Sequence, residues 1–280
     1  MHPVYVHIKK ELSPFYAEEE ASAMAKWISS DILHLSTLEL YTGKDMNFST
    51  KEWEELEDIL RRLKQREPLQ YILQEASFCG RSFHVEQGVL IPRPETEELV
   101  EWIVADYREA GQVRILDIGT GSGCIPVSLA QLLPEVQVSS CDVSVEALRI
   151  AAMNVKRYGD KVTLFCADIL KEELPECQVD VLVSNPPYIT ESERTDMEAN
   201  VLDWEPELAL FVPDSDPLRF YRRIARKGLD WLSEGGALYF EINRAYGTET
   251  VRMLEELGYC QIELRKDLSG NDRMIKAIRP

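Results

Sequence analysis

The sequence predicts an α/β protein with a mostly parallel sheet, preceded by a small helical domain. From about residue 90, short runs of β-branched and apolar residues alternate with segments of helical periodicity, which is typical of a parallel sheet covered on both faces. Before about residue 75, apolar residues recur instead at three- and four-residue steps, as on a helix face. The predicted strands span residues 113–118, 136–141, 162–166, 179–183 and 237–242, and helices are expected at 97–109 and 145–158.

Residues 1–75 contain two apolar stripes with helical spacing. A helix cap is expected at Ser13-Pro14 before the first stripe. A capping box beginning at Ser49 precedes the second, which Pro68 ends. Both stripes are typical of the core of a helix bundle, and this domain shows no chemistry of its own. The first stripe consists of Ala21, Met24, Ile28, Ile32 and Leu35, and the second of Trp53, Leu56, Ile59, Leu60 and Leu63.

Residues 76–89 predict a β-hairpin that connects the helical domain to a second domain formed by residues 90–280. Two short apolar segments flank Gly80-Arg81, which is a hairpin signal. Near the C-terminus, the apolar runs 261–265 and 274–278 lie too close together for a crossover helix. They are therefore expected to form an antiparallel hairpin at the edge of the sheet.

The chain is acidic. Of its 280 residues, 49 are Asp or Glu and 31 are Lys or Arg, so the net charge is -18 and the pI is about 4.7. Phosphate backbones attract surfaces rich in Lys and Arg, so direct binding of nucleic acid is not expected. The charge favours a basic protein as the partner.

The composition also predicts a cytoplasmic protein. The N-terminus lacks a secretory signal pattern, and no apolar stretch approaches the ~18 residues of a membrane span. None of the six cysteines forms a C-x-x-C pair, which predicts free thiols in a reducing compartment. All four histidines precede residue 90, so no metal is expected in the second domain. Three cysteines in or beside apolar runs are expected to be buried: Cys124, Cys141 and Cys166.

A glycine-rich loop follows the first predicted strand, at the sheet edge where open α/β folds bind ligands. Glycines in such a turn let the backbone approach a ligand closely. The spacing is D-x-G-x-G-x-G; a dinucleotide fingerprint would need glycine in place of Cys124, and a phosphate-binding loop would need a lysine. The loop reads Asp117-Ile118-Gly119-Thr120-Gly121-Ser122-Gly123.

Acidic residues end the next two predicted strands. Asp142 lies 25 residues beyond Asp117 and can accept from both ribose hydroxyls. Asp168 is placed to accept from an adenine amine, with Ile169 against the ring. Both aspartates could instead be helix caps. The loop and the two acids together resemble the class I methyltransferases, which bind S-adenosyl-L-methionine and release S-adenosyl-L-homocysteine.

The fourth strand runs into Asn185-Pro186-Pro187-Tyr188. An amide nitrogen is a poor nucleophile because its lone pair is delocalised, but its two N–H groups are good donors. The Asn185 side-chain oxygen and the Pro186 carbonyl can accept from both and aim the nitrogen at a methyl donor. The prolines fix the backbone, and Tyr188 can lie on the flat face of the substrate. The tetrapeptide therefore predicts methyl transfer to a planar, amide-like nitrogen, with Asn185 also beside the cofactor; the bland alternative is a proline-stiffened turn.

The N-P-P-Y sequence after a fourth strand resembles two groups, the adenine exocyclic-amine methyltransferases and the glutamine-amide methyltransferases. Four further stretches resemble the release factor glutamine methyltransferase family, PrmC/HemK, and the resemblance covers nearly the whole chain. The stretches are E-P-L-Q-Y-I at 67–72, L-I-P-R-P-E-T-E at 90–97, E-P-E-L-A-L-F at 205–211 and D-L-S-G-N-D-R at 267–273.

This resemblance implies a class I methyltransferase (Rossmann-like) fold. It implies methylation of the glutamine side-chain amide nitrogen in the Gly-Gly-Gln motif of class I peptide chain release factors. By the same resemblance, residues 119–123 hold the methionine end of the cofactor, Asp142 the ribose, and Asp168 with Ile169 the adenine. Residues 185–188 would hold the glutamine, and the helical domain would dock the release factor.

Three alternatives stay open on the residues alone. One is glutamine methylation of a ribosomal protein, and another is adenine methylation in DNA or RNA, which would need a basic track and a pocket for a flipped base. The third is a methyltransferase-like binder without activity, which would be expected to have lost Asn185 or the glycines.

The chain departs from the family pattern at three places, and none of them is expected to touch the chemistry. Gln74 and Asn271 stand where glycine is usual, and residues 243–246 replace a glycine-and-glutamine stretch. Residues 92–97 are expected to wall the active site, although their spacing gives them no defined role.

Overall fold

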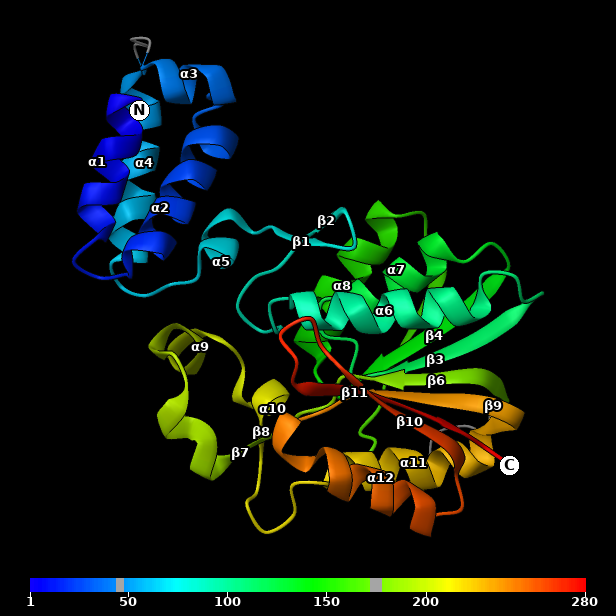
Figure 1. Cartoon of the computed structure of the whole chain (residues 1–280). Helices are drawn as coiled ribbons and strands as arrows, with labels where there is room; N and C mark the ends of the chain where they lie inside the picture. The colour runs from blue at the N-terminus through cyan, green and yellow to red at the C-terminus, as the bar shows by residue number, and fades with distance from the viewer. Residues whose placement is uncertain (44–47, 172–177) are drawn as a thin grey trace. The chain divides into compact units, whose positions relative to one another are not determined.

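The computed structural model describes residues 1–43, 48–171 and 178–280 (Figure 1). The chain forms two compact units. The helical unit consists of Met1–Leu73 together with Ala199–Trp204, and the α/β unit consists of Gln74–Glu198 and Glu205–Pro280. The break after Leu73 lies close to the predicted boundary at residue 75, whereas the inclusion of Ala199–Trp204 in the helical unit was not anticipated.

The helical unit is built from short amphipathic helices around one apolar core, as the two stripes predicted. The capping box is confirmed, because Ser49 N–H donates to Glu52 Oε2 at 2.6 Å and Glu52 N–H to Ser49 Oγ at 3.3 Å. Leu56, Leu60 and Leu63 are fully buried. The elements are α1 (Pro3–Leu12), α2 (Glu18–Trp27), the π-helix η1 (Ile28–Ile32), α3 (Thr37–Thr42), α4 (Thr50–Leu63), α5 (Leu69–Leu73) and α9 (Ala199–Trp204).

Two details predicted for this unit are wrong. Ser13-Pro14 does not begin a helix: Ser13 ends α1, with its N–H donating to Lys9 O at 2.9 Å. The proline that does occupy a first turn is Pro3, behind His2, whose Nδ1 accepts from Val4 N–H. Trp53 lies outside the core and is 39% exposed, because it is in the first turn of α4, where its ring meets other ring edges.

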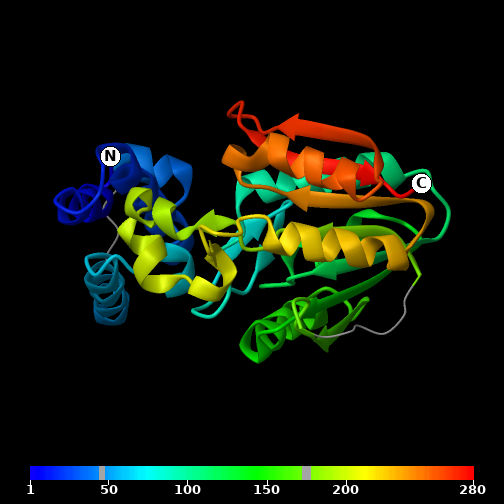
Figure 2. The same ribbon diagram turned by 90° about the horizontal axis from the view of Figure 1, so that it is seen from below.

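The α/β unit contains the predicted sheet, which has seven strands in the order β10-β11-β9-β6-β3-β4-β5 (Figures 1 and 2). Neighbours from β9 to β5 pair in parallel, whereas β11 pairs antiparallel with both β9 and β10. The edge hairpin is therefore confirmed. The strands are β3 (Val113–Ile118), β4 (Val136–Asp142), β5 (Val162–Cys166), β6 (Val179–Ser184), β9 (Leu232–Glu241), β10 (Cys260–Lys266) and β11 (Asp272–Ile278).

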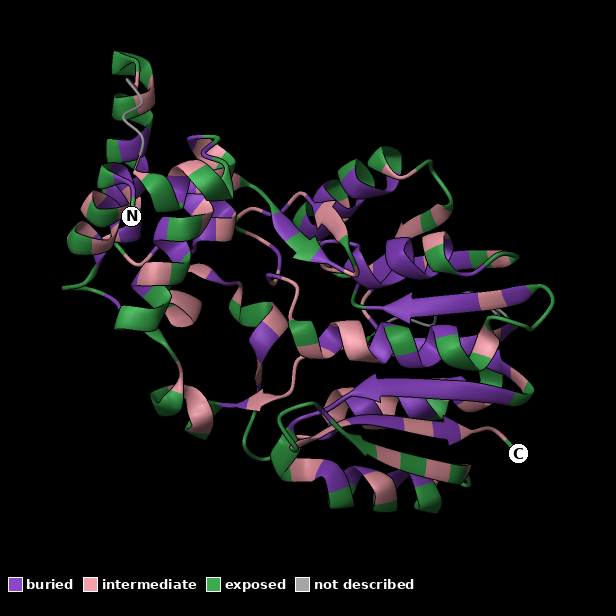
Figure 3. Ribbon diagram, turned by 45° about the horizontal axis from the view of Figure 1, so that its top comes forward, coloured by how far each residue is buried: buried purple, intermediate pink, exposed green. Residues whose placement is uncertain are grey.

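Helices cover both faces of this sheet. The helices α6 (Pro94–Tyr107), α7 (Cys124–Leu132) and α8 (Val145–Arg157) lie on one face and α11 (Arg219–Trp231) and α12 (Gly247–Glu256) on the other (Figure 1). Each face has its own apolar core, and the central strands are buried over most of their length (Figure 3). This burial on both faces explains the near-continuous apolar runs in the sequence.

Small elements complete the α/β unit. The predicted hairpin in residues 76–89 is present: β1 (Ala76–Phe78) pairs antiparallel with β2 (Arg81–Phe83), and both phenylalanines enter the core beneath α6. A second small sheet pairs β7 (Ile189–Thr190) with β8 (Phe211–Val212) in parallel. The remaining elements are η2 (Glu191–Asp196), α10 (Glu207–Leu210) and η3 (Arg244–Tyr246).

The cysteine prediction holds in part. Cys124 and Cys141 are buried, and both are free thiols. Cys166 is exposed, contrary to prediction, because it ends β5, the edge strand of the sheet. Cys177 lies outside the described residues. Over the described ranges 1–43, 48–171 and 178–280, no helix combines the length and the apolar character needed to cross a membrane.

At position 74, the backbone explains why glycine is usual in the family. Gln74 has a φ of +54°, in the left-handed region that glycine adopts without steric cost. The usual glycine is therefore the residue that this backbone favours. Gln74 occupies the position with its side chain exposed.

Candidate active site

The glycine-rich loop joins the end of β3 to the start of α7. Gly119, Gly121 and Gly123 have φ of +84°, +52° and +82°, so any other residue would be strained at each position. A Cβ on Gly123 would lie 3.3 Å from Ala151 Cβ, whereas a Cβ on Gly121 would meet nothing within 4 Å. The loop thus packs against α8 at Gly123 and borders open space at Gly121.

Three buried polar atoms of this loop have no well-formed hydrogen bond with the described residues. They are Asp117 Oδ1, Thr120 Oγ1 and Ser122 Oγ. The other carboxylate oxygen, Asp117 Oδ2, accepts from Ser140 Oγ at 2.5 Å. Buried polar atoms are rarely left without partners in folded proteins, so this cluster marks a place where a polar ligand can complete the hydrogen bonding.

Burial raises the pKa of Asp117 to about 7, with a smaller contribution from the nearby Asp142 carboxylate. Between pH ~4, the unfolded value, and pH 7, the folded protein therefore holds a proton that the unfolded chain releases. The stability that Asp117 contributes is full below that range and is lost as the pH rises to 7.

This pKa gives a testable pH dependence. From pH 5 to pH 7, the free energy of unfolding of the wild type should fall by about 2 kcal/mol relative to Asp117→Asn, which cannot titrate. Urea unfolding of both proteins at the two pH values, without cofactor, measures this difference. Parallel pH profiles would show that Asp117 is already ionised in the free protein.

Asp142 contacts the glycine loop directly. Its Oδ2 accepts from Gly121 N–H at 2.9 Å, and its Oδ1 accepts from Ser144 N–H at 2.9 Å. The N-cap of α8 is Ser144, whose Oγ accepts from Ala147 N–H, so Asp142 is not the helix cap. Burial raises the pKa of Asp142, and the backbone N–H groups oppose that shift.

Asp168 lies in the neighbouring loop after β5. The Asp142 carbonyl accepts from Ala167 N–H at 3.0 Å, which joins the two strand ends. Asp168 accepts from Leu170 N–H at 3.0 Å and pairs with Lys171 at 2.9 Å, and this hydrogen bond with Lys171 lowers its pKa. The following Ile169 is buried. The structure thus brings both predicted acids to the same edge of the sheet as the glycine loop.

The turn of Asn185, Pro186, Pro187 and Tyr188 adjoins this loop. Ser184 on β6 lies opposite Ile118 on β3 and donates through Oγ to the Ile118 carbonyl at 2.6 Å. A Cβ on Gly119 would lie 4.0 Å from the Asn185 carbonyl oxygen. The two motifs predicted to hold the cofactor and the reacting nitrogen are therefore neighbours at the carboxyl ends of two paired strands.

Thr96 and Glu241, whose roles were not predicted from the sequence, hold the side chains of this turn by hydrogen bonds. Asn185 Nδ2 donates to Thr96 Oγ1 at 3.2 Å, and Thr96 Oγ1 donates to Glu241 Oε2 at 2.5 Å. Tyr188 OH donates to Glu241 Oε1 at 3.0 Å. Thr96 and Glu241 are 3% and 1% exposed. Thr96 belongs to the 90–97 stretch, so that stretch has a defined contact with the turn.

Burial sets the protonation of this group of residues. It raises the pKa of Tyr188 well above its usual range, so the phenol stays protonated and can donate. It also raises the pKa of Glu241, while hydrogen bonds from Thr96 and Tyr188 and the charge of Arg273 lower it. Arg273 Nη1 lies 3.4 Å from Tyr188 OH and its Nε lies 3.1 Å from Asp267 Oδ2.

The departure at residues 243–246 touches the turn, contrary to prediction. Asn243 Nδ2 donates to the Tyr188 carbonyl at 3.0 Å and to the Glu193 carboxylate at 2.9 Å. Asn271 acts less directly: its N–H donates to Asp267 Oδ1 at 2.9 Å, and Asp267 pairs with Arg273. Asn243, in the stretch that replaces the usual glycine-and-glutamine residues, therefore supports the Asn-Pro-Pro-Tyr turn with its polar side chain.

Two of the family stretches, 90–97 and 205–211, meet at Glu205. Its carboxylate is buried, accepts from Ile91 N–H at 3.1 Å and forms an ion pair with Arg93. The segment 90–97 is thus fixed at its start by Glu205 and at Thr96 by Glu241.

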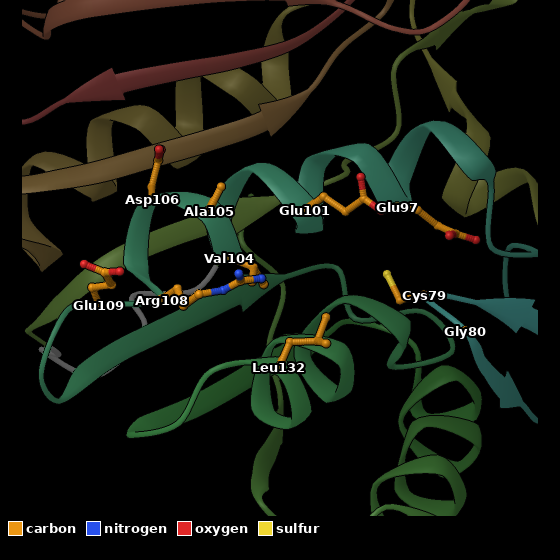
Figure 4. Close-up of a pocket in the computed structure, with 10 residues that line it drawn as sticks. All are labelled: Cys79, Gly80, Glu97, Glu101, Val104, Ala105, Asp106, Arg108, Glu109 and Leu132. Carbon is orange, nitrogen blue, oxygen red and sulfur yellow. The ribbon is translucent and has the colours of Figure 1, made fainter.

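A separate cleft of about 850 Å³ lies along α6 (Figure 4). None of the residues predicted for cofactor or substrate lines it. The lining residues are Cys79, Gly80, Glu97, Glu101, Val104, Ala105, Asp106, Arg108, Glu109 and Leu132.

The seven-stranded sheet, the glycine loop and the neighbouring Asn-Pro-Pro-Tyr turn define an S-adenosylmethionine-dependent methyltransferase with the class I fold. Residues 96–203 match the methyltransferase small domain, and residues 5–73 match the PrmC N-terminal domain. The chain belongs to the release factor glutamine methyltransferase family.

Its relatives support this over the full length. The chain is 50% identical to the release factor glutamine methyltransferase of Bacteroides thetaiotaomicron, with 100% of both chains covered. It is 42% identical to that of Flavobacterium psychrophilum, over 95% of this chain and 94% of the relative. A crystal structure of a methyltransferase from Pyrococcus furiosus has a TM-score of 0.52 at 14% identity, over 82% of this chain and 99% of that one, which shows the fold alone.

Proposed function

We propose that this protein methylates the side-chain amide nitrogen of the glutamine in the Gly-Gly-Gln motif of class I peptide chain release factors. The observation that carries the proposal is the position of Asn185, beside the glycine loop and with its Nδ2 group held by Thr96. That hydrogen bond leaves the amide oxygen of Asn185 as the acceptor for a substrate NH2 group.

The residues at the ends of the parallel strands suit the cofactor. The glycine loop, residues 119–123, together with Asp117 would hold the methionine end, and the buried polar atoms of the loop would gain partners there. Asp142 would accept from the ribose hydroxyls, and Asp168 from the adenine amine, with Ile169 against the ring. When bound, S-adenosyl-L-methionine supplies a methyl group on a positively charged sulfur.

The turn supplies the acceptors for the substrate. Asn185 Oδ1 and the Pro186 carbonyl accept one N–H each, which orients the flat NH2 group and increases electron density on nitrogen as the new bond forms. The proton that nitrogen loses leaves through these acceptors. Pro187 keeps the backbone rigid, and Tyr188 borders the flat face of the amide.

The rest of the chain selects the partner. Residues 1–75 dock the release factor, residues 76–89 connect the docking domain to the methyltransferase domain at 90–280, and the acidic surface favours a basic protein over nucleic acid. A translation factor as substrate places the enzyme in the cytoplasm, where its described free thiols stay reduced.

The experiment that tests the proposal supplies labelled cofactor and three purified acceptors: a class I release factor, a ribosomal protein mixture and adenine-containing DNA. The expected result is one methyl group on the glutamine of the Gly-Gly-Gln motif, located by mass spectrometry of the digested factor. A release factor carrying Gly-Gly-Glu is the control, and it should accept no label. Label on ribosomal protein or DNA, with none on the factor, would overturn the proposal.

A further inference from the structure

We infer that Glu241, acting through Thr96, is a positioning residue that fixes which end of the Asn185 amide faces the substrate. The inference rests on the proposed role of Asn185 and extends it to two residues that do not touch substrate. Its physical basis is a chain of hydrogen bonds that runs from a buried carboxylate to the amide.

An asparagine amide is ambiguous by itself. Its oxygen and its NH2 group have nearly the same shape, so either could face the substrate at little steric cost. Only the oxygen can accept from a substrate N–H group; an inward-facing NH2 would present donors to donors. If both orientations of the amide were equally populated, half of the molecules would be inactive. Another group in the protein must therefore select one orientation.

Thr96 makes the selection through the direction of its own hydrogen bond. A hydroxyl has one proton to donate, and Thr96 donates it to Glu241 Oε2 at 2.5 Å. Its oxygen can then only accept, and it accepts from Asn185 Nδ2 at 3.2 Å. The amide NH2 is thereby drawn toward Thr96, and Oδ1 is turned to the other side.

Glu241 sets that direction because both of its carboxylate oxygens act as acceptors in these hydrogen bonds. It accepts from Thr96 on one oxygen and from Tyr188 OH on the other, at 2.5 and 3.0 Å. Both donors converge on a side chain that is 1% exposed, so water does not compete for these bonds. The same carboxylate thus orders both side chains of the turn that are proposed to meet the substrate, Asn185 and Tyr188.

The test compares Thr96→Val, Thr96→Ser and Glu241→Gln as full-length proteins. Valine has nearly the shape of threonine but cannot accept from Asn185, so kcat should fall about tenfold while the Kd for S-adenosylhomocysteine stays within about twofold. Serine keeps the hydroxyl and should restore kcat. The glutamine side chain of Glu241→Gln can donate to Thr96 and so reverse the direction of the hydrogen bonds. This variant should therefore lower kcat at least as much as Thr96→Val does.

Two readouts separate positioning from general support of the fold. The side-chain ¹H–¹⁵N signals of Asn185, assigned by their loss in Asn185→Ala, should shift in Thr96→Val and return in Thr96→Ser. Because the two residues act in series, the double variant Thr96→Val with Glu241→Gln should lose no more kcat than Glu241→Gln alone. The matched control is Thr250→Val, which removes another buried hydroxyl, bonded to the Tyr246 carbonyl, and should leave the Asn185 signals in place.

The outcomes distinguish this inference from the proposed function. If Asn185→Ala keeps its activity, the role of Asn185 fails and the positioning role fails with it. If Asn185→Ala is inactive while Thr96→Val keeps full kcat, or if the losses of the two single variants multiply, only the inference about Glu241 and Thr96 is overturned.

Discussion

Replacing Asn185 by alanine should lower kcat for methyl transfer by about 10³-fold while the cofactor Kd changes by less than about threefold. The variant loses the side-chain acceptor that orients the reacting nitrogen, and removal of one preorganised hydrogen-bonding group from an active site costs on the order of 10²–10³ in rate. Asn185 lies beside the glycine loop rather than in it, so the contacts proposed for the cofactor survive. Single-turnover transfer to the release factor, with calorimetric titration of S-adenosylhomocysteine, measures both quantities.

The calorimetric arm is also the control for this variant. Retained cofactor binding with an unchanged melting temperature shows that the loss of rate does not come from unfolding. Asn185 is only half-buried, so its truncation leaves little cavity. A variant that kept more than a tenth of the wild-type rate would show that the Pro186 carbonyl alone orients the nitrogen, and the two-acceptor mechanism would have to be abandoned.

The features predicted correctly from sequence are those set by neighbours along the chain. Strand and helix periodicity, the glycine loop and the capping box at Ser49 depend on residues a few positions apart. The errors at Ser13 and Trp53 concern the same local signals: a serine-proline pair has the same appearance beyond a helix end as at a helix start, and an apolar residue in a first turn need not face the core. The exposure of Cys166 depends instead on strand order. An apolar strand at the edge of a sheet has a neighbour on one side only, so its residues can be exposed to solvent.

The missed part of the site depends on contacts across the chain. Glu241 lies 145 residues beyond Thr96, and Thr96 lies 89 residues before Asn185. Their meeting requires β9 to be the neighbour of β6, an order that no local pattern encodes. Given that order, the position of Glu241 at the carboxyl end of β9 becomes informative, because ligand sites of open α/β sheets lie at that edge.

The cofactor half of the site yields the second large effect. Replacing Asp142 by alanine should raise the Kd for S-adenosylhomocysteine by about 10- to 100-fold. Hydrogen bonds to a charged group contribute about 1.5–3 kcal/mol each, and 1.4 kcal/mol is a factor of ten. The ribose hydroxyls would lose the acceptor proposed for them. Gly121 N–H would lose the partner that it has at 2.9 Å, so the glycine loop would also lose a hydrogen bond that holds its backbone.

Asp142→Asn is the matched control, because it keeps the shape and one acceptor oxygen. It should fall between the wild type and Asp142→Ala in calorimetric titration. Asp168→Ala should raise the Kd less than Asp142→Ala does. The Asp168 carboxylate already pairs with the exposed Lys171, and the backbone N–H group that it holds is that of Leu170 rather than one of the glycine loop. An Asp142→Ala variant with wild-type affinity would show that the carboxylate only orders the backbone at Gly121 and Ser144.

Asp142→Ala and Asn185→Ala should also differ in kind. With saturating cofactor, Asp142→Ala should keep kcat within about threefold of the wild type, because the Asp142 carboxylate accepts from Gly121 N–H and Ser144 N–H and not from the groups proposed to hold the substrate nitrogen. A loss confined to affinity in one variant and to turnover in the other follows from β4 and β6, the two strands on either side of β3: β4 ends in Asp142, and β6 runs into Asn185. If Asp142→Ala lowered kcat as much as Asn185→Ala at saturation, the glycine loop would be positioning the substrate nitrogen as well, and the division of labour between the two strand ends would be wrong.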